Sequence, residues 1–307
     1  MSVWAFFMQL HNSTEMIMQN LLLRFSQCGL YASLGIALLA CGGGSGTATP
    51  PAPAQALSAT VSAVTAVAPL SYGRLASIDV AGVNLDLGIT LAAPGCTGLA
   101  EGANSSATLK RYTCTVAVAM ALPVEVKSGG GASLFTASIP VPDPQVSLVT
   151  SLGTVILELN PAEAPLSVNN FLKYTGDGFY VNLLFHRVIP GFVIQAGGFT
   201  SGPVSKAATY GPIKLESNNG LSNVRGSLAM ARTQVADSAT SEFYINTVNN
   251  PALDFVSASQ PGYAVFGKVL DGLPVVDAIA AVPTANRGGL QNVPVNDVLI
   301  ISARQTR

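Results

Sequence analysis

Residues 185–200, FHRVIPGFVIQAGGFT, carry the most informative pattern in the chain. They set one arginine, Arg187, and one glutamine, Gln195, among apolar residues. Taken alone, Phe192 and Val193 would be interpreted as ordinary core residues, and Arg187 as one half of a surface ion pair. Their joint occurrence in one short segment, with further motifs after it, favours a binding or catalytic site instead.

Four further segments follow in a fixed order. They read GSLAMAR at 226–232, DSATSEFYIN at 237–246, LD at 253–254 and GYAVFGKV at 262–269. Together with residues 185–200, they resemble the cyclophilin-type peptidyl-prolyl isomerases, and most closely the periplasmic bacterial members. The resemblance covers essentially all of residues 145–307. It implies a closed antiparallel barrel of eight strands that is capped by a helix at each end.

The local patterns in this half of the chain fit that fold. Residues 146–152 and 154–159 predict a pair of strands around the Leu-Gly-Thr turn at residues 152–154. Residues 161–176 predict a helix with proline in its first turn and glycine at its end. A second helix is predicted over residues 274–281, because apolar side chains repeat there on one face.

The resemblance also implies roles for individual residues. The guanidinium of Arg187 donates a hydrogen bond to the prolyl nitrogen. Gln195 binds the substrate backbone and steadies Arg187, and Phe192 lines an apolar slot for the proline ring. These three are the expected catalytic residues. The expected substrate-binding residues are Val193, Ala231, Arg232, Glu242, Tyr244, Leu253 and Tyr263. Glu242 departs from the family pattern, since glutamine is common there, and Arg232 replaces a frequent asparagine.

The expected reaction is rotation about an X–Pro amide, which needs no nucleophile, metal or cofactor. It requires an apolar slot and a hydrogen-bond donor that is aimed at the prolyl nitrogen. The chain has only two histidines, His11 and His186, so a histidine metal cluster is nearly excluded. Because the reaction moves no proton, we interpret His186 as a hydrogen-bonded structural residue and not as a general base.

Composition sets the class of protein. The 307 residues include 15 Lys and Arg against 16 Asp and Glu, for a net charge of −1, which argues against a nucleic-acid partner. Charged residues make up 10% and hydrophobic residues 49%, so the chain is not disordered. Frequent Gly (30) and Pro (19) favour many short strands. We therefore expect an all-β-dominated fold.

The first forty residues have the features of an export signal. Arg24 precedes an apolar run over residues 28–40, and that run ends in Leu-Leu-Ala before Cys41. This ending resembles the lipobox of bacterial lipoproteins, which implies that residues 1–40 are removed and that Cys41 is lipidated. The alternative is an ordinary signal peptide with an incidental cysteine. The residues before Met18 fit a signal poorly, so we expect the true start at Met18.

The expected membrane anchor continues into a tether. Residues 41–56 follow the lipidated cysteine with a Gly/Ser segment and then a Pro/Ala segment, which predicts a flexible linker. Gly42 is not the aspartate that retains enterobacterial lipoproteins at the inner membrane. By resemblance, we expect a lipid-anchored protein of the bacterial envelope that faces the periplasm, at the outer membrane more than at the inner.

Residues 57–142 predict a small β-sandwich, because short alternating and β-branched runs are separated by turn residues. Residues 72–85 resemble one hairpin of the Ig-like modules of bacterial envelope proteins. Once Cys28 is removed and Cys41 is lipidated, Cys96 and Cys114 are the one remaining pair. We expect a disulfide between them, with two reduced thiols as the alternative. This domain is interpreted as a spacer or docking module.

Three hypotheses about function remain. The first is an envelope-anchored prolyl isomerase (a rotamase) that binds proline-containing polypeptides as a monomer and assists the folding of exported proteins. The second is a peptide-binding or chaperone module with little or no turnover, which Glu242 would favour. The third is a structural envelope protein, for which Arg187→Ala would have no effect on function.

Overall fold

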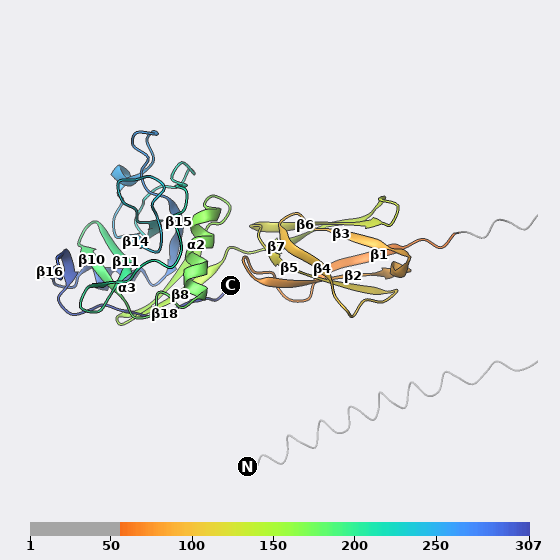
Figure 1. The fold of residues 1–307 in the computed structure, drawn as a ribbon, viewed down its shortest axis with the longest axis horizontal. Coiled ribbons are helices and arrows are strands. Elements are labelled where there is room, and N and C mark those ends of the chain that lie inside the picture. Colours follow the sequence, from red (N-terminus) through yellow and green to blue (C-terminus); the bar gives the residue numbers. More distant parts are fainter. Residues whose placement is uncertain (1–55) are drawn as a thin grey trace, which may run out of the picture. The chain divides into compact units, whose positions relative to one another are not determined.

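The computed structural model describes residues 56–307, which fold into β-strands with two α-helices and two 3₁₀ turns among them (Figure 1). The predicted signal peptide, His11, Met18, Cys41 and nearly all of the tether lie outside the described residues. No helix within residues 56–307 is both long and apolar enough to cross a membrane.

The first described part is a sandwich of two antiparallel sheets. One sheet has the strand order β1-β2-β5-β4 and the other β3-β6-β7. The 3₁₀ turn η2 (Leu85–Leu87) lies between β2 and β3. The strands are β1 (Thr60–Ala66), β2 (Leu75–Val83), β3 (Ile89–Ala92), β4 (Cys96–Glu101), β5 (Leu109–Val116), β6 (Met120–Ser128) and β7 (Ser133–Val141).

Numbered along the chain, these seven strands have the arrangement ABED on CFG, which is the strand order of constant-type immunoglobulin domains. Alternate side chains of β2, β3, β5 and β6 are buried between the sheets, as the period of two requires. Ile78 and Val80 from one sheet and Leu122 and Val126 from the other are fully buried. The sequence pattern identified β1, β2, β5 and β7 but did not single out β3, β4 or β6.

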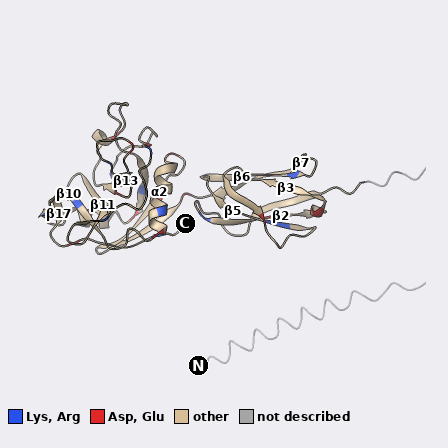
Figure 2. Ribbon diagram, viewed as in Figure 1, with Lys and Arg blue, Asp and Glu red and all other residues tan. Residues whose placement is uncertain are grey.

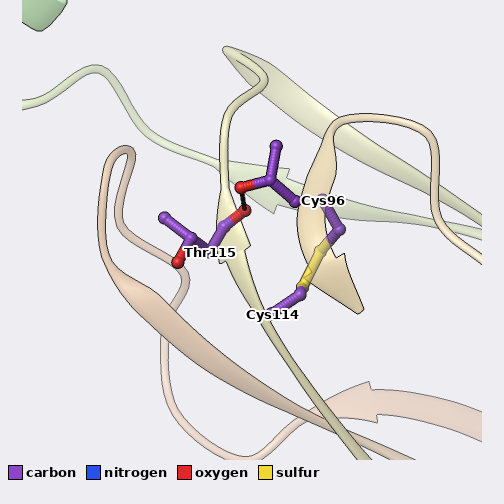
Figure 3. The surroundings of a disulfide bond; sticks show 4 residues. Cys96, Cys114 and Thr115 are labelled. Atoms are coloured by element: carbon purple, nitrogen blue, oxygen red, sulfur yellow. Dashed lines mark hydrogen bonds between the residues drawn. A yellow bond between two sulfur atoms is a disulfide. The ribbon is translucent and has the colours of Figure 1, made fainter. Parts of the chain in front are cut away.

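Cys96 and Cys114 form a disulfide between the neighbouring strands β4 and β5 (Figure 3). Their Cα atoms lie 5.5 Å apart, within the range that a disulfide spans. The Thr97 hydroxyl donates a hydrogen bond of 3.3 Å to the Thr115 carbonyl beside the bridge. The two cysteines therefore tie the edge strand β4 to the centre of its sheet.

Residues from Gln145 onward form a third, larger antiparallel sheet. Its strand order is β10-β11-β14-β13-β15-β9-β8-β18, and the short strand β12 pairs with β11. A separate hairpin consists of β16 (Thr284–Arg287) and β17 (Leu290–Pro294). The strands of the large sheet are β8 (Gln145–Thr150), β9 (Gly153–Leu159), β10 (Leu183–Ile189), β11 (Val193–Thr200), β12 (Val204–Ser205), β13 (Ser227–Met230), β14 (Phe243–Asn246), β15 (Val265–Asp271) and β18 (Ile300–Gln305).

The eight strands along this path curl into a barrel whose two end strands meet without a full ladder. Leu184 and Leu299 form an isolated bridge there. The amide of Phe185 donates to the Val298 carbonyl at 2.9 Å, and the amide of Asn182 donates to the Ile300 carbonyl at 2.8 Å. The eight-stranded antiparallel barrel is thus confirmed, but it is nearly closed instead of fully closed.

Two helices pack on the barrel sheet. Helix α2 (Pro165–Gly176) begins four residues later than predicted, because Pro165 occupies its first position. Its Phe171 ring lies 5.2 Å from the ring of Phe243 and 5.4 Å from that of Phe266 in the core. Helix α3 (Leu273–Ala280) begins and ends one residue earlier than predicted. Its own residues Val276 and Ile279 are buried.

The β8–β9 turn falls at Ser151 and Leu152, so it begins one residue earlier than the predicted turn at residues 152–154. Gly153 is the first residue of β9 and has φ +138°. A Cβ atom there would lie 2.7 Å from Cγ2 of Val275 on α3. The glycine is therefore needed for the close approach of α3 to the strand as well as for its backbone angle.

Charged residues are sparse along the ribbon of both sandwich and barrel (Figure 2), in keeping with the 10% of charged residues in the whole chain. A charged residue that lines a cavity is therefore informative about what binds there.

Candidate active site

A cavity of about 140 Å³ lies on the barrel and brings together nine of the ten residues predicted for the site. Arg187 comes from β10, Val193 and Gln195 from β11, and Tyr244 from β14. Leu253 ends the 3₁₀ turn η3 (Pro251–Leu253). The lining residues are Arg187, Phe192, Val193, Gln195, Ala231, Arg232, Tyr244, Leu253 and Tyr263.

The strand register explains why these side chains meet. Arg187 pairs with Gln195 across the β10–β11 hairpin, and Gln195 pairs in turn with Tyr244 on β14. The hairpin turns at Gly191, whose φ of +68° favours glycine, and it places Phe192 beside the cavity. Three antiparallel strands therefore align Arg187, Gln195 and Tyr244 in one row.

The floor of the cavity is apolar. A small buried cluster beneath it consists of Val193, Ala229, Tyr244 and Val265, each at most 4% exposed. Partly buried Phe192, Ala231, Leu253 and Tyr263 pack around this cluster as walls. The rings of Tyr244 and Tyr263 meet edge to face with their centroids 5.9 Å apart. A slot with these walls suits a small apolar ring such as that of proline.

Arg187 places a cation at the rim of this apolar slot. Its Nη1 donates to Oε1 of Gln195 at 3.2 Å, and its guanidinium carbon lies 5.7 Å from the Phe192 ring centroid. The bond to Gln195 uses one of the five N–H donors that the planar guanidinium carries. Arg187 can therefore donate further hydrogen bonds to a molecule in the slot.

Glu242 lies behind Gln195 and is the one predicted residue that does not line the cavity. Its Oε2 accepts a hydrogen bond of 2.7 Å from Nε2 of Gln195 and lies 3.3 Å from Nε2 of His186. The side chain fits because residue 198 is glycine, since a Cβ there would lie 2.7 Å from Cδ of Glu242. A continuous chain of polar groups thus runs from His186 through Glu242 and Gln195 to Arg187.

The charge on Glu242 follows from these contacts. Burial raises the pKa of the Glu242 carboxyl, but the hydrogen bond and charge of His186 and the hydrogen bond from Gln195 outweigh it. The net pKa lies below the usual range, so the side chain is an ionised acceptor at neutral pH. Nε2 of His186 faces the Glu242 carboxylate, which can only accept, so the imidazole donates from Nε2. Among the described residues, Nδ1 of His186 has no partner.

The side chain of Arg232 contacts Tyr263, which also lines the cavity, and the backbone beside it. Its Nε and Nη2 donate to the Gly262 carbonyl at 2.9 and 2.8 Å, and Nη1 donates to the Thr233 carbonyl at 2.8 Å. The guanidinium carbon lies 4.6 Å from the ring centroid of Tyr263. Arg232 was predicted as a substrate-binding residue, but the contact of its side chain with Tyr263 was not predicted.

Sequence reasoning also missed three buried asparagines beneath the slot, Asn223, Asn246 and Asn250. Asn223 accepts a hydrogen bond of 2.7 Å from the Tyr244 hydroxyl, and Asn250 donates one of 3.0 Å to the Phe192 carbonyl. Burial, followed by the charges of Tyr263 and Asp254, raises the pKa of Tyr244, so its hydroxyl stays protonated and donates. Asparagine usually signals a turn, which hides a buried network in a single sequence.

The comparisons with known proteins agree on one family. Residues 145–305 match the cyclophilin type peptidyl-prolyl cis-trans isomerases. Peptidyl-prolyl cis-trans isomerase A of Dickeya dadantii is 50% identical over 159 residues, which cover 52% of this chain and 83% of that protein. Peptidyl-prolyl cis-trans isomerase B of Escherichia coli is 50% identical over 159 residues, which cover 51% of this chain and 96% of that protein.

A solved cyclophilin type peptidyl-prolyl cis-trans isomerase of Cryptosporidium parvum shares 26% identity and a TM-score of 0.47, and the match covers 54% of this chain and 98% of that one. The family match contains the whole barrel from β8 to β18 and all nine lining residues. The chain belongs to the family of cyclophilin-type peptidyl-prolyl cis-trans isomerases.

Proposed function

We propose that Arg187 catalyses the isomerisation by donating a hydrogen bond to the prolyl nitrogen of a peptide whose proline ring occupies the apolar slot. Rotation about an X–Pro amide faces a barrier of about 18–20 kcal/mol, because resonance gives the C–N bond partial double-bond character. Uncatalysed exchange takes tens to hundreds of seconds at 25 °C. The enzyme must stabilise the twisted amide more than the planar one.

The physical basis is the change at the prolyl nitrogen. As the amide twists, that nitrogen loses resonance, becomes pyramidal and accepts a hydrogen bond that the planar form accepts poorly. A donor placed there lowers the barrier selectively, and about 7 kcal/mol of such stabilisation would accelerate exchange roughly 10⁵-fold. The permanent charge and rigid fork of the Arg187 guanidinium suit this task.

The observation that carries the proposal is the position of Arg187. The cation stands at the rim of the apolar slot, held by Gln195 and Phe192, with guanidinium donors still available. Phe192, Tyr244 and Leu253 would contact the proline ring while Arg187 donates a hydrogen bond to the prolyl nitrogen. The Gln195 amide has one further N–H, which would bind the substrate backbone. The reaction requires no proton transfer, in keeping with the structural role of His186.

The test is cis–trans exchange of a short Ala-Pro peptide, followed by NMR exchange spectroscopy with the full-length protein. Arg187→Ala is expected to lower kcat/KM by about 10²–10³-fold, the cost of removing one aimed donor. Glu163→Gln is the matched control, because Glu163 is an exposed residue of the same domain. Full activity of a folded Arg187→Ala protein would refute the role of Arg187.

A second candidate function is peptide binding with little turnover. The observation that favours it is the ionised Glu242, two hydrogen bonds away from Arg187, since a nearby negative charge weakens the pull of the guanidinium on the prolyl nitrogen. This candidate predicts that the wild-type protein binds the Ala-Pro peptide but does not accelerate exchange, and that Glu242→Gln raises the rate.

We also propose that the protein is an envelope lipoprotein whose isomerase domain faces the periplasm and acts on exported proteins. The lipobox-like ending at Cys41 supports it, and a disulfide between Cys96 and Cys114 suits an oxidising compartment. Metabolic labelling with a radioactive fatty acid, with Cys41→Ala as the control, tests the anchor. A Cys41→Ala protein that is labelled and sediments with membranes like the wild type would refute it.

A further inference from the structure

The proline slot rests on a buried network of asparagine side chains. Asn223, Asn246 and Asn250 are 1%, 0% and 9% exposed. Nδ2 of Asn250 donates to Oδ1 of Asn246 at 2.7 Å, and Nδ2 of Asn246 donates to Oδ1 of Asn223 at 3.2 Å. Such amides are costly to bury unless they are bonded, so a connected set of three beneath an apolar slot requires an explanation.

The side-chain amide of Asn223 has all of its hydrogen-bonding positions occupied. Its Oδ1 accepts hydrogen bonds from the Tyr244 hydroxyl at 2.7 Å and from Asn246. Its Nδ2 donates to the Leu253 carbonyl at 3.1 Å and to Oδ1 of Asp254 at 2.9 Å. An asparagine amide offers two acceptor positions and two donor hydrogens, and all four are occupied here. Neither aspartate nor leucine could make the same set of bonds.

The partners of Asn223 are walls of the slot. Tyr244 and Leu253 line it directly, and they come from β14 and η3. The Leu253 carbonyl that accepts from Asn223 also accepts the backbone N–H of Tyr263, at 2.9 Å. The same carbonyl therefore positions Tyr263 as well. One buried amide therefore sets the relative position of three walls from separate segments of the chain.

The network also reaches Phe192, a further residue that lines the slot. The Asn223 carbonyl accepts the backbone N–H of Asn250 at 2.8 Å, and the side chain of Asn250 donates to the Phe192 carbonyl at 3.0 Å. Phe192 stands beside Arg187 at the rim. Hydrogen bonds that pass through Asn223 thus connect Phe192 with Leu253 and Tyr244, and all three residues line the slot.

We propose that Asn223 is a positioning residue of the isomerase, which sets the width of the proline slot by holding Tyr244, Leu253 and, through Asn250, Phe192. Asn223 is not among the lining residues and acts only through these walls. The inference rests on the proposed function, because it assumes that the proline ring occupies the slot. Its consequence is selectivity for a five-membered ring over a larger one.

The experiment compares two peptides that differ by one ring methylene, Ala-Pro and Ala-pipecolyl, with the full-length protein. A well-fitted apolar pocket discriminates one methylene by about 10–200-fold, so kcat/KM of the wild type should favour the prolyl peptide on that scale. In Asn223→Ala, this discrimination is expected to fall about fivefold or more, with KM for the prolyl peptide raised more than kcat is lowered.

Two further variants separate positioning from stability. Tyr244→Phe keeps the ring and removes only the hydroxyl that bonds Asn223, so it should reduce the discrimination in the same direction even if Asn223→Ala folds poorly. Asn170→Ala is the matched control, since Asn170 is 7% exposed and donates to the Thr240 carbonyl from α2. It should lower the Tm without changing the ring selectivity.

The outcomes are distinct. Loss of ring discrimination in Asn223→Ala and Tyr244→Phe, but not in Asn170→Ala, would support the proposal. Unchanged discrimination in a folded Asn223→Ala, or an equal change in Asn170→Ala, would overturn it. If the wild type binds both peptides without turnover, the proposed catalysis fails separately, and the same ratio measured as dissociation constants by NMR titration decides the role of Asn223.

Discussion

Arg187 shows how a single residue acquires a role from its neighbours. Considered by itself, an arginine on a β-hairpin suggests a surface ion pair. Among the described residues it makes no ion pair, and instead donates to the neutral amide of Gln195. An arginine whose charge is not already paired with a carboxylate can direct its remaining donors into the slot.

Replacement of Arg187 by lysine tests whether the fork or the charge matters. A lysine ammonium keeps the charge but lacks the planar pair of donors, so it cannot bond Gln195 and a prolyl nitrogen in the same geometry. We expect Arg187→Lys to lower kcat/KM by about 10–100-fold, less than Arg187→Ala, in the Ala-Pro exchange assay. Wild-type activity in Arg187→Lys would show that charge alone suffices.

The carboxylate of Glu242 should make a pH-dependent contribution to the stability of the folded protein. Its folded-state pKa lies below the usual value because the bonds from His186 and Gln195 outweigh burial, so protonation opposes folding. The stabilisation is therefore complete at neutral pH and is lost as the pH falls below about 4. We expect Glu242→Gln to lower the Tm at pH 7 by roughly 2–4 °C for each kcal/mol lost, with the difference from wild type shrinking in acid.

Thermal unfolding followed by circular dichroism between pH 3 and pH 8 checks this expectation. Glu163→Gln is the control, because the exposed Glu163 has no side-chain bond of this kind among the described contacts. A Glu242→Gln protein whose Tm differs from wild type by the same amount at every pH would show that the carboxylate is not the source of the effect.

Helix α2 depends on a residue that lies far away in the sequence. Ala164, which precedes the helix, has no side chain that could cap it. Glu216 supplies the cap, since its Oε1 accepts the Leu166 amide at 2.9 Å and its Oε2 accepts the Ser167 amide at 2.8 Å. A carboxylate at this end also complements the helix dipole. The segment that contains Glu216 is thereby tied to the helix.

Removal of this distant cap should destabilise the barrel without changing catalysis. We expect Glu216→Ala to lower the free energy of unfolding by about 0.5–2 kcal/mol, the usual cost of losing an N-terminal cap. Urea unfolding measures it, and kcat/KM of the Ala-Pro peptide should remain at the wild-type value. An unchanged urea midpoint would show that solvent satisfies the Leu166 and Ser167 amides equally well.

At the scale of the whole molecule, the described chain divides its tasks between a β-sandwich that carries the disulfide and a barrel that carries the slot. The bridge closes a segment with a sequence separation of 18 residues. In the chain-entropy account, closing a loop of about this size stabilises the folded state by about 3 kcal/mol. The residues that line the slot all lie in the other part of the chain.

Removal of the disulfide should therefore lower the stability of the β-sandwich and leave that of the barrel unchanged. We expect a Cys96→Ala/Cys114→Ala protein to lose protection against hydrogen exchange in peptides from residues 60–141, by up to about 3 kcal/mol in opening free energy. Peptides from residues 145–305 and the isomerase activity should be unchanged. Hydrogen exchange with mass spectrometry locates the effect, and a loss of protection confined to the barrel would contradict the expectation.

The sequence alone indicated the family and the all-β-dominated class, and its resemblance to that family implied the nine residues that line the slot. Four of them, Arg187, Phe192, Val193 and Gln195, lie on one β-hairpin, whose local register brings their side chains together. It also identified both helices, since their periodicity is local. Only the tertiary structure placed Glu242 behind Gln195, Arg232 against Tyr263, and Asn223 beneath the walls. Those contacts join residues distant in sequence, and hydrogen bonds between buried polar groups leave no periodic pattern along a chain.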